Sequence, residues 1–302
     1  MSLLVTGSIG IDTVETPWGK VEGAMGGSAV YFAYAASYFF SPVRLVGVVG
    51  GDCDEEFLRP LRQNTRIDLA GLEVRPASKT FRWHGRYHAD VNLRDTVAVE
   101  LNVLAEHGPK VPPAFRDSTY VFLANSHPAL QLELLGQLDR PALVVADTMD
   151  LWINNEKPAL MRLVAKLDGL VLNDSEVKAF TGLANVVEAG RAVSKLVRRF
   201  VVVKKGEHGS LLFADGCVCP MPSYPTTRVV DPTGAGDSFA GAMMGYLAAA
   251  DRLDAATLRT AIAYGTITAS IALEDFSIHR MLQTTREHID VRMDELRRLV
   301  GF

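Results

Sequence analysis

The sequence predicts an α/β fold in which helices cover both faces of a mostly parallel central sheet, giving three layers. Two observations lead to this fold class. Short runs of apolar, β-branched residues recur along the chain, and longer segments with helical periodicity separate them. A third observation, one stretch of alternating apolar and polar residues, predicts a smaller β-structure beside the main sheet. In such sheets ligands bind beyond the carboxyl ends of the strands, where we therefore expect the functional residues.

The predicted elements alternate along the chain. Six apolar runs are predicted to be strands buried on both faces: 3–6, 43–49, 120–123, 143–146, 169–172 and 200–203. Seven segments are predicted to be helices: 28–39, 54–64, 130–138, 159–167, 186–198, 236–249 and 255–272. Repetition of strand and helix in this order is typical of parallel sheets.

The alternating stretch 72–88 breaks this rhythm, and we interpret it as an antiparallel flap. With the turn-rich piece 13–23 it would form a β-structured lid, comprising about 13–23 and 72–98, inserted in one domain that spans 1–302. An ordinary sheet edge is the alternative interpretation. The alternation places two sets of side chains on opposite faces: Phe81, Trp83 and Tyr87 on one, and Arg82, His84, Arg86 and His88 on the other.

Composition excludes several classes of protein. Of the 302 residues, 48% are hydrophobic, which is enough for a large core, and the formal net charge of −4 with no long basic run argues against a nucleic-acid partner. Three cysteines are too few for a disulfide framework or a four-ligand zinc site. Residues 1–10 do not resemble a signal peptide, and no apolar run is long enough to span a membrane. We therefore expect a cytoplasmic protein without a membrane partner.

The most informative segment is 229–242, VVDPTGAGDSFAGA, a strand end that leads through a glycine-rich turn into a long helix. Gly234 and Gly236 allow a tight turn and a close approach to a ligand. Free amides and the positive end of the helix dipole would suit a phosphate group. Asp237, in the first helical turn, is expected to have a low pKa, to orient a hydroxyl nucleophile and to accept its proton late in phosphoryl transfer. A carboxylate that only stabilises the helix start is the alternative.

The string 231–239, DPTGAGDSF, closely resembles the C-terminal signature of the ribokinase-like carbohydrate and nucleoside kinases, the PfkB family. The pieces 26–29, GGSA, and 46–52, VGVVGGD, resemble the first conserved block of that family, so the resemblance covers essentially the whole chain. It implies transfer of the γ-phosphate of ATP to a sugar, sugar derivative or cyclitol. A nucleoside kinase is the alternative, and a ligand-binding regulator without turnover is a third possibility that the intact motif residues argue against.

The resemblance also assigns roles to single residues. It implies that Asp237 is the catalytic base, that the backbone amides of Gly234, Ala235 and Gly236 form an anion hole, and that Asp231 and Thr233 help hold a monovalent cation such as K⁺.

Two further motifs concern the nucleotide. Asn173 and Glu176 form a capping-box pattern, and they also resemble the family's Asn-x-x-Glu motif, which organises phosphates and water-bound Mg²⁺. The segment 201–210, VVVKKGEHGS, resembles the nucleotide-phosphate loop, with Lys204 where the family often has threonine. Lys204 is either a phosphate contact or a solvated strand end. We expect Gly206 and Gly209 to line this loop, with adenine between it and the helical piece 261–265.

The acceptor site is less well defined. Asp12 matches the aspartate that binds sugar hydroxyls in the family, and Gly26 and Gly27 match glycines that line the same pocket. Tyr31 stands where sugar-binding ribokinases usually have asparagine, so the identity of the acceptor stays open. The flap offers aromatic residues for a base or sugar ring and arginines (82 and 86) for an anionic substrate group, or it forms a homodimer interface. Closure of the flap would exclude water.

Overall fold

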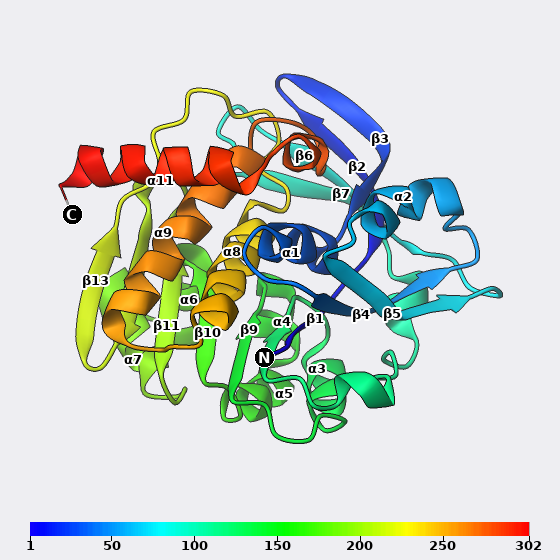
Figure 1. The fold of residues 1–302 in the computed structure, drawn as a ribbon, viewed down its shortest axis with the longest axis horizontal. Coiled ribbons are helices and arrows are strands. Elements are labelled where there is room, and N and C mark those ends of the chain that lie inside the picture. Colours follow the sequence, from blue (N-terminus) through cyan, green and yellow to red (C-terminus); the bar gives the residue numbers. More distant parts are fainter. Residues whose placement is uncertain (302) are drawn as a thin grey trace.

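The central feature of the fold is a nine-stranded sheet, seen in a computed structural model that describes residues 1–301 (Figure 1). Neighbouring strands are parallel, except that β12 runs antiparallel to both β11 and β13. The predicted fold class is thus confirmed. The strands, in their order across the sheet, are β13 (Cys217–Met221), β12 (Ser210–Ala214), β11 (Phe200–Lys204), β10 (Gly169–Asn173), β9 (Leu143–Asp147), β8 (Tyr120–Leu123), β1 (Leu3–Thr6), β4 (Val43–Gly50) and β5 (Ile67–Arg75).

Helices cover both faces of this sheet, and each face has its own apolar core. Among residues 1–301 no helix combines the length and the apolar character needed to cross a membrane. One face carries α1 (Ser28–Ser37), α2 (Glu55–Gln63), α8 (Ala235–Ala250), α9 (Ala255–Ala272), α10 (His279–Leu282) and α11 (Arg286–Val300). The other face carries α3 (Pro128–Leu135), α4 (Asp150–Asn155), α5 (Lys157–Val164), α6 (Asp174–Thr181) and α7 (Val186–Ser194).

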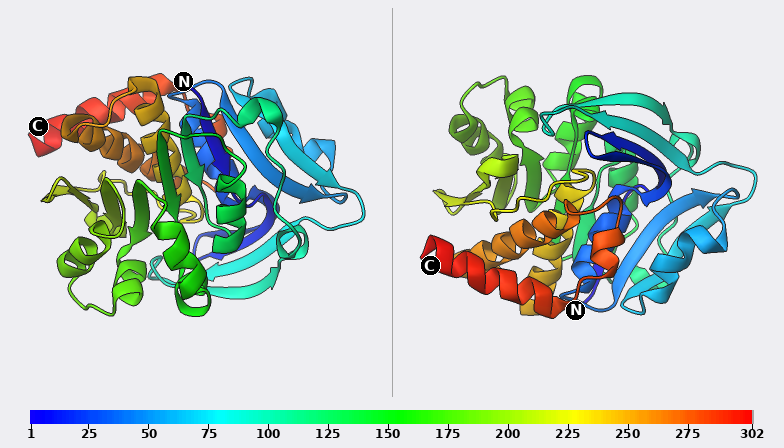
Figure 2. Two further views of the ribbon diagram at one scale, coloured as in Figure 1. Left: turned by 90° about the horizontal axis from the view of Figure 1, so that it is seen from below. Right: turned by 90° about the horizontal axis from the view of Figure 1, so that it is seen from above.

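A separate four-stranded sheet projects from the main body at the upper right of Figure 1, and Figure 2 shows it from two more directions. Its order is β3 (Gly19–Gly26), β2 (Gly10–Thr16), β6 (Phe81–Tyr87) and β7 (Arg94–Glu100). Strands β2 and β6 pair in parallel, although they are about 70 residues apart in the chain. We call this unit the small sheet.

The predicted boundaries of the flap need one correction. The segment 72–75, expected in the flap, belongs to β5 at the edge of the main sheet, where it pairs in parallel with β4. Its alternation arises because an edge strand has one face on the core and the other toward solvent. The sheet-edge interpretation is therefore right for 72–75, and the alternation predicted for 81–87 is that of β6 in the small sheet.

The six predicted core strands are all present. Local sequence also explains where some of the helices begin. Asp54 and Asp254 cap α2 and α9 by accepting hydrogen bonds from Phe57 N and Thr257 N, each at 2.8 Å. Helices α4, α10 and α11 were not predicted.

Helices α1 and α8 lie close together because α8 presents glycine to α1. A Cβ on Gly245 would lie only 2.7 Å from the carbonyl oxygen of Ala36.

This packing makes a stability prediction. Gly245→Ala would raise intrinsic helix propensity by about 1 kcal/mol, but overlap with the α1 backbone should cost about 1–3 kcal/mol, so we expect net destabilisation. Chemical denaturation would measure the change in the free energy of unfolding. Gly136→Ala at the end of α3 is the matched control, because its Cβ would meet no atom nearer than 3.4 Å. A Gly245→Ala protein at least as stable as the wild type would contradict this packing.

Candidate active site

The glycine-rich turn before α8 is shaped by close packing against α1. Gly234 is the N-cap of α8 with φ of 75°, a left-handed conformation that favours glycine. A Cβ at this position would also overlap the ring of Tyr31. Only 2% of Tyr31 is exposed, so its ring forms the floor beneath the turn. Tyr31, expected to contact the substrate, therefore supports the turn from below.

The turn places the first amides of α8 and the carboxyl group of Asp237 side by side. The amide of Ala235 donates to Pro232 O at 3.3 Å, whereas the next amides lie in the first helical turn, where backbone donors have no partner from the helix. The low pKa expected for Asp237 is wrong. Burial raises its pKa above the ordinary value, and the positive charges of Lys204 and Arg94 only partly oppose this effect.

Asp147, at the carboxyl end of β9, is a buried carboxyl group that the sequence analysis missed. Its Oδ1 has no hydrogen-bond partner. Burial raises its pKa well above the ordinary value, the charge of Asp237 raises it further, and Lys204 opposes both. A signal was available, because Asp147 directly follows the predicted strand 143–146, at the edge of the sheet where ligands bind.

Asn173 and Glu176 form a complete capping box at the start of α6. Asn173 Oδ1 accepts from Glu176 N at 2.8 Å, and Glu176 Oε2 accepts from Asn173 N at 2.7 Å. Burial raises the pKa of Glu176 to about 7, while Lys204 lowers it. The interpretation of these two residues as a capping box is therefore confirmed. The same carboxyl group also lies within the electrostatic reach of Lys204. Lys204 faces the glycine-rich turn formed by residues 231–237, which we call the catalytic turn.

Lys204, at the carboxyl end of β11, lies directly beside this turn. Its Nζ atom is 2.5 Å from the position that a Cβ on Gly236 would occupy, so the ammonium group lies against the backbone of the turn. Its charge acts on the carboxyl groups of Asp237, Asp147 and Glu176. Lys204 is thus the cation at the centre of the site.

The two loop glycines have different surroundings. Gly206, with φ of 54°, packs against the small sheet, because a Cβ there would lie 2.9 Å from Asn92 Oδ1. Gly209, with φ of 79°, packs so tightly on Met221 O that its role is to shape the loop. The adenine position expected between this loop and 261–265 stays a prediction. These residues are buried in α9, and Gly265 packs against Phe239, which follows Asp237 by two residues in α8.

Asp12 of β2 approaches the catalytic turn from the small sheet. Its carboxylate packs against Gly26, where a Cβ would overlap it, and its Oδ1 is buried without a hydrogen-bond partner. Burial raises the pKa of Asp12 to about 8, and the charges of Asp231 and Asp237 add to the effect. Gly27 begins α1 with φ of 100° and lies against Ser8 O. A buried acceptor without a donor from the protein is open to a hydrogen bond from water or from a ligand.

Asp231 joins three segments at the base of the turn. Its Oδ1 accepts from Thr233 N at 2.8 Å, and its Oδ2 accepts from Ser277 N at 3.2 Å. Ser277 has φ of 55° and also donates to Met25 O of the small sheet through its hydroxyl. Thr233 Oγ1 donates to the hydroxyl of Tyr87 at 3.2 Å. The small sheet is thus tied to the catalytic turn on two sides.

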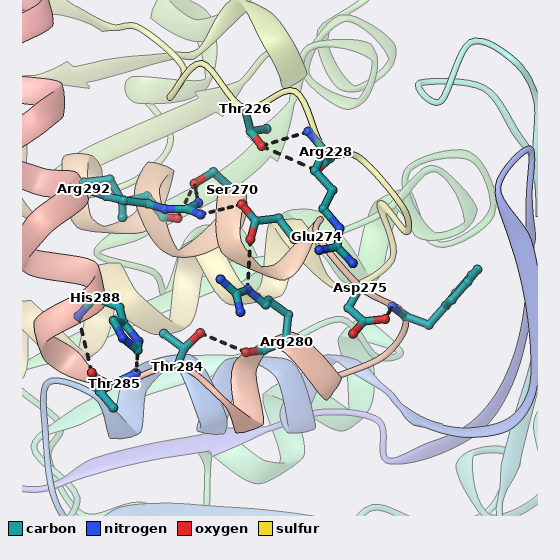
Figure 3. Close-up of polar contacts among 12 residues, drawn as sticks. Thr226, Arg228, Ser270, Glu274, Asp275, Arg280, Thr284, Thr285, His288 and Arg292 are labelled. Carbon is teal, nitrogen blue, oxygen red and sulfur yellow. Dashed lines mark hydrogen bonds and ion pairs between the residues drawn. The ribbon is translucent and has the colours of Figure 1, made fainter.

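A charged cluster holds the segment after α9 that carries Ser277 (Figure 3). Glu274 is 6% exposed and lies between two arginines, accepting from Arg280 Nε at 2.9 Å and from Arg292. Arg292 also donates to Ser270 at 3.0 Å. This network fixes the segment to α9 and α11, and through Ser277 it fixes Asp231.

The two faces of the small sheet carry different chemistry, as the alternation predicts. Trp83 stands opposite Asp12 in the parallel register, so both lie on the face toward the site. Its ring lies across Gly85, where no Cβ would fit. The arginines expected to meet the substrate do not face the site. Arg86 pairs with Glu15 at 2.6 Å and Arg82 with Asp52 at 2.8 Å.

Arg94 of β7 is the arginine that faces the site, and the sequence analysis missed it. It pairs with Tyr87 across the strands, and its guanidinium lies 5.6 Å from the centre of the Trp83 ring. Arg82 and Arg86 were singled out because they lie in the alternating stretch 72–88, whereas Arg94 follows that stretch, in a strand that is exposed at every position.

Comparison with known proteins agrees with this geometry. A cytidine kinase of Thermococcus kodakarensis is 30% identical over 257 residues, which are 83% of this chain and 89% of that protein. A nucleoside kinase of Burkholderia thailandensis, solved with inosine, superposes with a TM-score of 0.79 at 19% identity over 97% of each chain. A protein from E. coli described as a putative ribokinase II, solved with ATP and Mg²⁺, gives a TM-score of 0.76 at 17% identity over 98% of this chain and all of that one.

A family model matches most of the chain. Residues 4–285 match the pfkB family of carbohydrate kinases, which covers the main sheet, the small sheet and the catalytic turn. The chain therefore belongs to the pfkB family of carbohydrate kinases and is a phosphotransferase that acts on a hydroxyl group.

Proposed function

We propose that the protein is an ATP-dependent nucleoside kinase. The observation that carries the proposal is the pairing of Asp12 and Trp83 on one face of the small sheet, beside the turn that bears Asp237. Asp12 offers an unpartnered, buried carboxylate oxygen to the hydroxyl groups of a ribose. Trp83 offers a large aromatic side chain against whose edge a base can pack. The cytidine kinase relative, which the chain matches over most of its length, supports a nucleoside acceptor over a free sugar.

The phosphoryl transfer follows from the placement of Asp237. The hydroxyl oxygen of the acceptor forms a bond to the γ-phosphorus, the bond between that phosphorus and the β–γ bridging oxygen breaks, and ADP leaves with that oxygen. The hydroxyl proton passes to the carboxylate of Asp237. Amides at the start of α8 and the ammonium of Lys204 stabilise the negative charge on the phosphoryl oxygens. A raised pKa makes Asp237 a better proton acceptor than an ordinary carboxylate.

The acidic residues around the turn fit Mg²⁺ carried by ATP. Asp147 Oδ1 is buried without a partner, and Glu176 lies near the same lysine. Among residues 1–301 no group of three His, Cys, Asp or Glu side chains forms a metal site by itself, which fits an ion held mainly by phosphates and water. Asp147 and Glu176 are the residues that would hold it. When bound, Mg²⁺ neutralises charge on the phosphates.

Two further parts of the proposal concern K⁺ and the oligomeric state. Among residues 1–301 the carboxylate of Asp231 accepts from the amides of Thr233 and Ser277 and makes no ion pair, which leaves its charge for a monovalent cation beside Thr233. Turnover should then be higher in KCl than in tetramethylammonium chloride, and equal rates would contradict the proposed cation site.

Exposed Trp18, Val97 and Val99 on the small sheet favour a homodimer, which sedimentation velocity would detect.

The acceptor class is tested directly by a substrate panel. With Mg-ATP, we expect phosphate transfer to nucleosides, and little or none to free pentoses, hexoses or inositols. Asp237→Asn should lower kcat about 10²-fold or more, while the affinity for ATP changes little, because the variant keeps the amides but loses the proton acceptor. Transfer to free sugars alone would contradict the nucleoside assignment. Near-normal turnover of Asp237→Asn would contradict the site itself.

The pH dependence of the reaction tests the role of Asp12. Only ionised Asp12 can accept hydrogen bonds from two hydroxyl groups, and its pKa in the free protein is about 8. At saturating ATP, kcat/KM for the nucleoside should therefore rise with pH and level off near that value. A flat profile between pH 6 and 9 would contradict this role.

Asp12→Asn is the matched variant for this profile. Its kcat/KM should be lower than that of the wild type, and the rise of kcat/KM toward pH 8 should be absent. It should also melt at a higher temperature than the wild type at pH 8. A carboxyl group whose pKa is raised on folding is stabilising below its unfolded pKa, and this stability is lost as pH rises through the folded pKa. An unchanged melting temperature would show that Asp12 is not buried as described.

A further inference from the structure

We propose that Arg94 is a catalytic residue delivered by the small sheet, and that its guanidinium binds the phosphoryl group during transfer. The inference rests on the proposed active site, and it adds a component that the sequence motifs do not contain. It also explains how docking of the small sheet on the catalytic turn would control the reaction.

The first step is the position of the hairpin that joins β6 and β7. At one end of this hairpin, the hydroxyl of Tyr87 accepts a hydrogen bond from Thr233 in the catalytic turn at 3.2 Å. In its loop, Asn92 lies against Gly206 of the nucleotide-phosphate loop, where a Cβ would be 2.9 Å from Asn92 Oδ1. The hairpin tip therefore bridges the two loops between which the phosphates of ATP would lie.

The second step is the state of Arg94 itself, which begins β7 immediately after this tip. Within residues 1–301 its guanidinium forms no ion pair with a carboxylate. The other two arginines of the small sheet, Arg82 and Arg86, are both paired and lie on the opposite face. Its guanidinium lies 5.6 Å from the centre of the Trp83 ring, and its side chain also contacts Tyr87, its partner across the strands. Arg94 is thus positioned by Trp83 and Tyr87, and because a guanidinium carries five N–H donors, contact with Tyr87 leaves donors for another group.

The third step concerns the carboxyl groups on which the charge of Arg94 acts. The charge of Arg94 counters the rise that burial causes in the pKa of Asp237, and it does the same for Glu176. The guanidinium is therefore within electrostatic reach of the proton acceptor and of the acidic residue on the nucleotide side. Lys204 acts on the same two carboxyl groups from the main sheet. The phosphoryl group would pass between a cation on the main sheet and a cation on the small sheet.

The chemistry needs such a second cation. As the acceptor oxygen bonds to the γ-phosphorus and the bridging oxygen leaves with ADP, negative charge is spread over the three equatorial oxygens. A guanidinium can donate two parallel hydrogen bonds to such oxygens, whereas an ammonium acts as a point charge. Because Arg94 is carried by the small sheet, this stabilisation is complete only when the hairpin tip is docked.

Steady-state kinetics of Arg94→Ala test the proposal. We expect kcat for nucleoside phosphorylation to fall about 10²–10³-fold, with KM for the nucleoside changed less than about fivefold, because the contact strengthens in the transition state. Arg94→Lys should recover only part of the rate, since it restores the charge without the paired donors. Arg86→Ala is the matched control: it removes an arginine of the same sheet from the opposite face, and kcat should stay within about twofold.

Calorimetric titration separates catalysis from folding and binding. Arg94→Ala should bind ADP as the wild type does, but it should lose the tighter binding of ADP with nucleoside and aluminium fluoride, a mimic of the phosphoryl group in transfer. Unchanged binding of that mimic, or an equal loss for Arg86→Ala, would overturn the role of Arg94. Asp237→Asn is assayed in parallel. If Asp237→Asn is inactive while Arg94→Ala is normal, only this inference fails; if Asp237→Asn remains active, the proposed site fails.

Discussion

Burial of several carboxyl groups around one glycine-rich turn is the constraint on which the site depends. Asp12, Asp147 and Asp237 all have raised pKa values, and in each case burial is the largest cause. Lys204 and Arg94 are the cations whose charges oppose this at Asp237. An excess of buried acidic groups is costly in the free protein. It is relieved by ligands that bring hydrogen-bond donors and cations, as a nucleoside and Mg-ATP do.

The rest of the fold serves to bring these groups together. The main sheet supplies Asp147 and Lys204 at the carboxyl ends of β9 and β11, and α6, which follows the strand between them, supplies Glu176. The small sheet supplies Asp12 and Arg94. Glycines allow the close approaches that result. Gly234 rests on Tyr31, and Gly236 admits Lys204. The charged cluster around Glu274 stabilises the same turn from outside, because the segment that it anchors also binds Asp231.

Much of the fold was predictable because each buried strand is a short apolar run, and its periodicity depends on local sequence alone. The turn that carries Asp237 was predictable for the same reason. Edge strand β5 was misassigned, since an edge strand and a flap strand share one alternating pattern. The raised pKa of Asp237 was missed because burial is a property of the folded chain. Asp147 and Arg94 have no motif of their own, and only the meeting of two sheets makes them neighbours of Asp237.

The central claim, that buried and partly protonated carboxyl groups await the ligands, is tested most directly by counting protons released on nucleoside binding. Titration calorimetry at pH 7 in buffers of different ionisation enthalpy gives this number. With a pKa of about 8, Asp12 is mostly protonated in the free protein and would ionise as it accepts ribose hydroxyls. We expect the wild type to release close to one proton per nucleoside and Asp12→Asn to release none. Binding without proton release by the wild type would contradict the account.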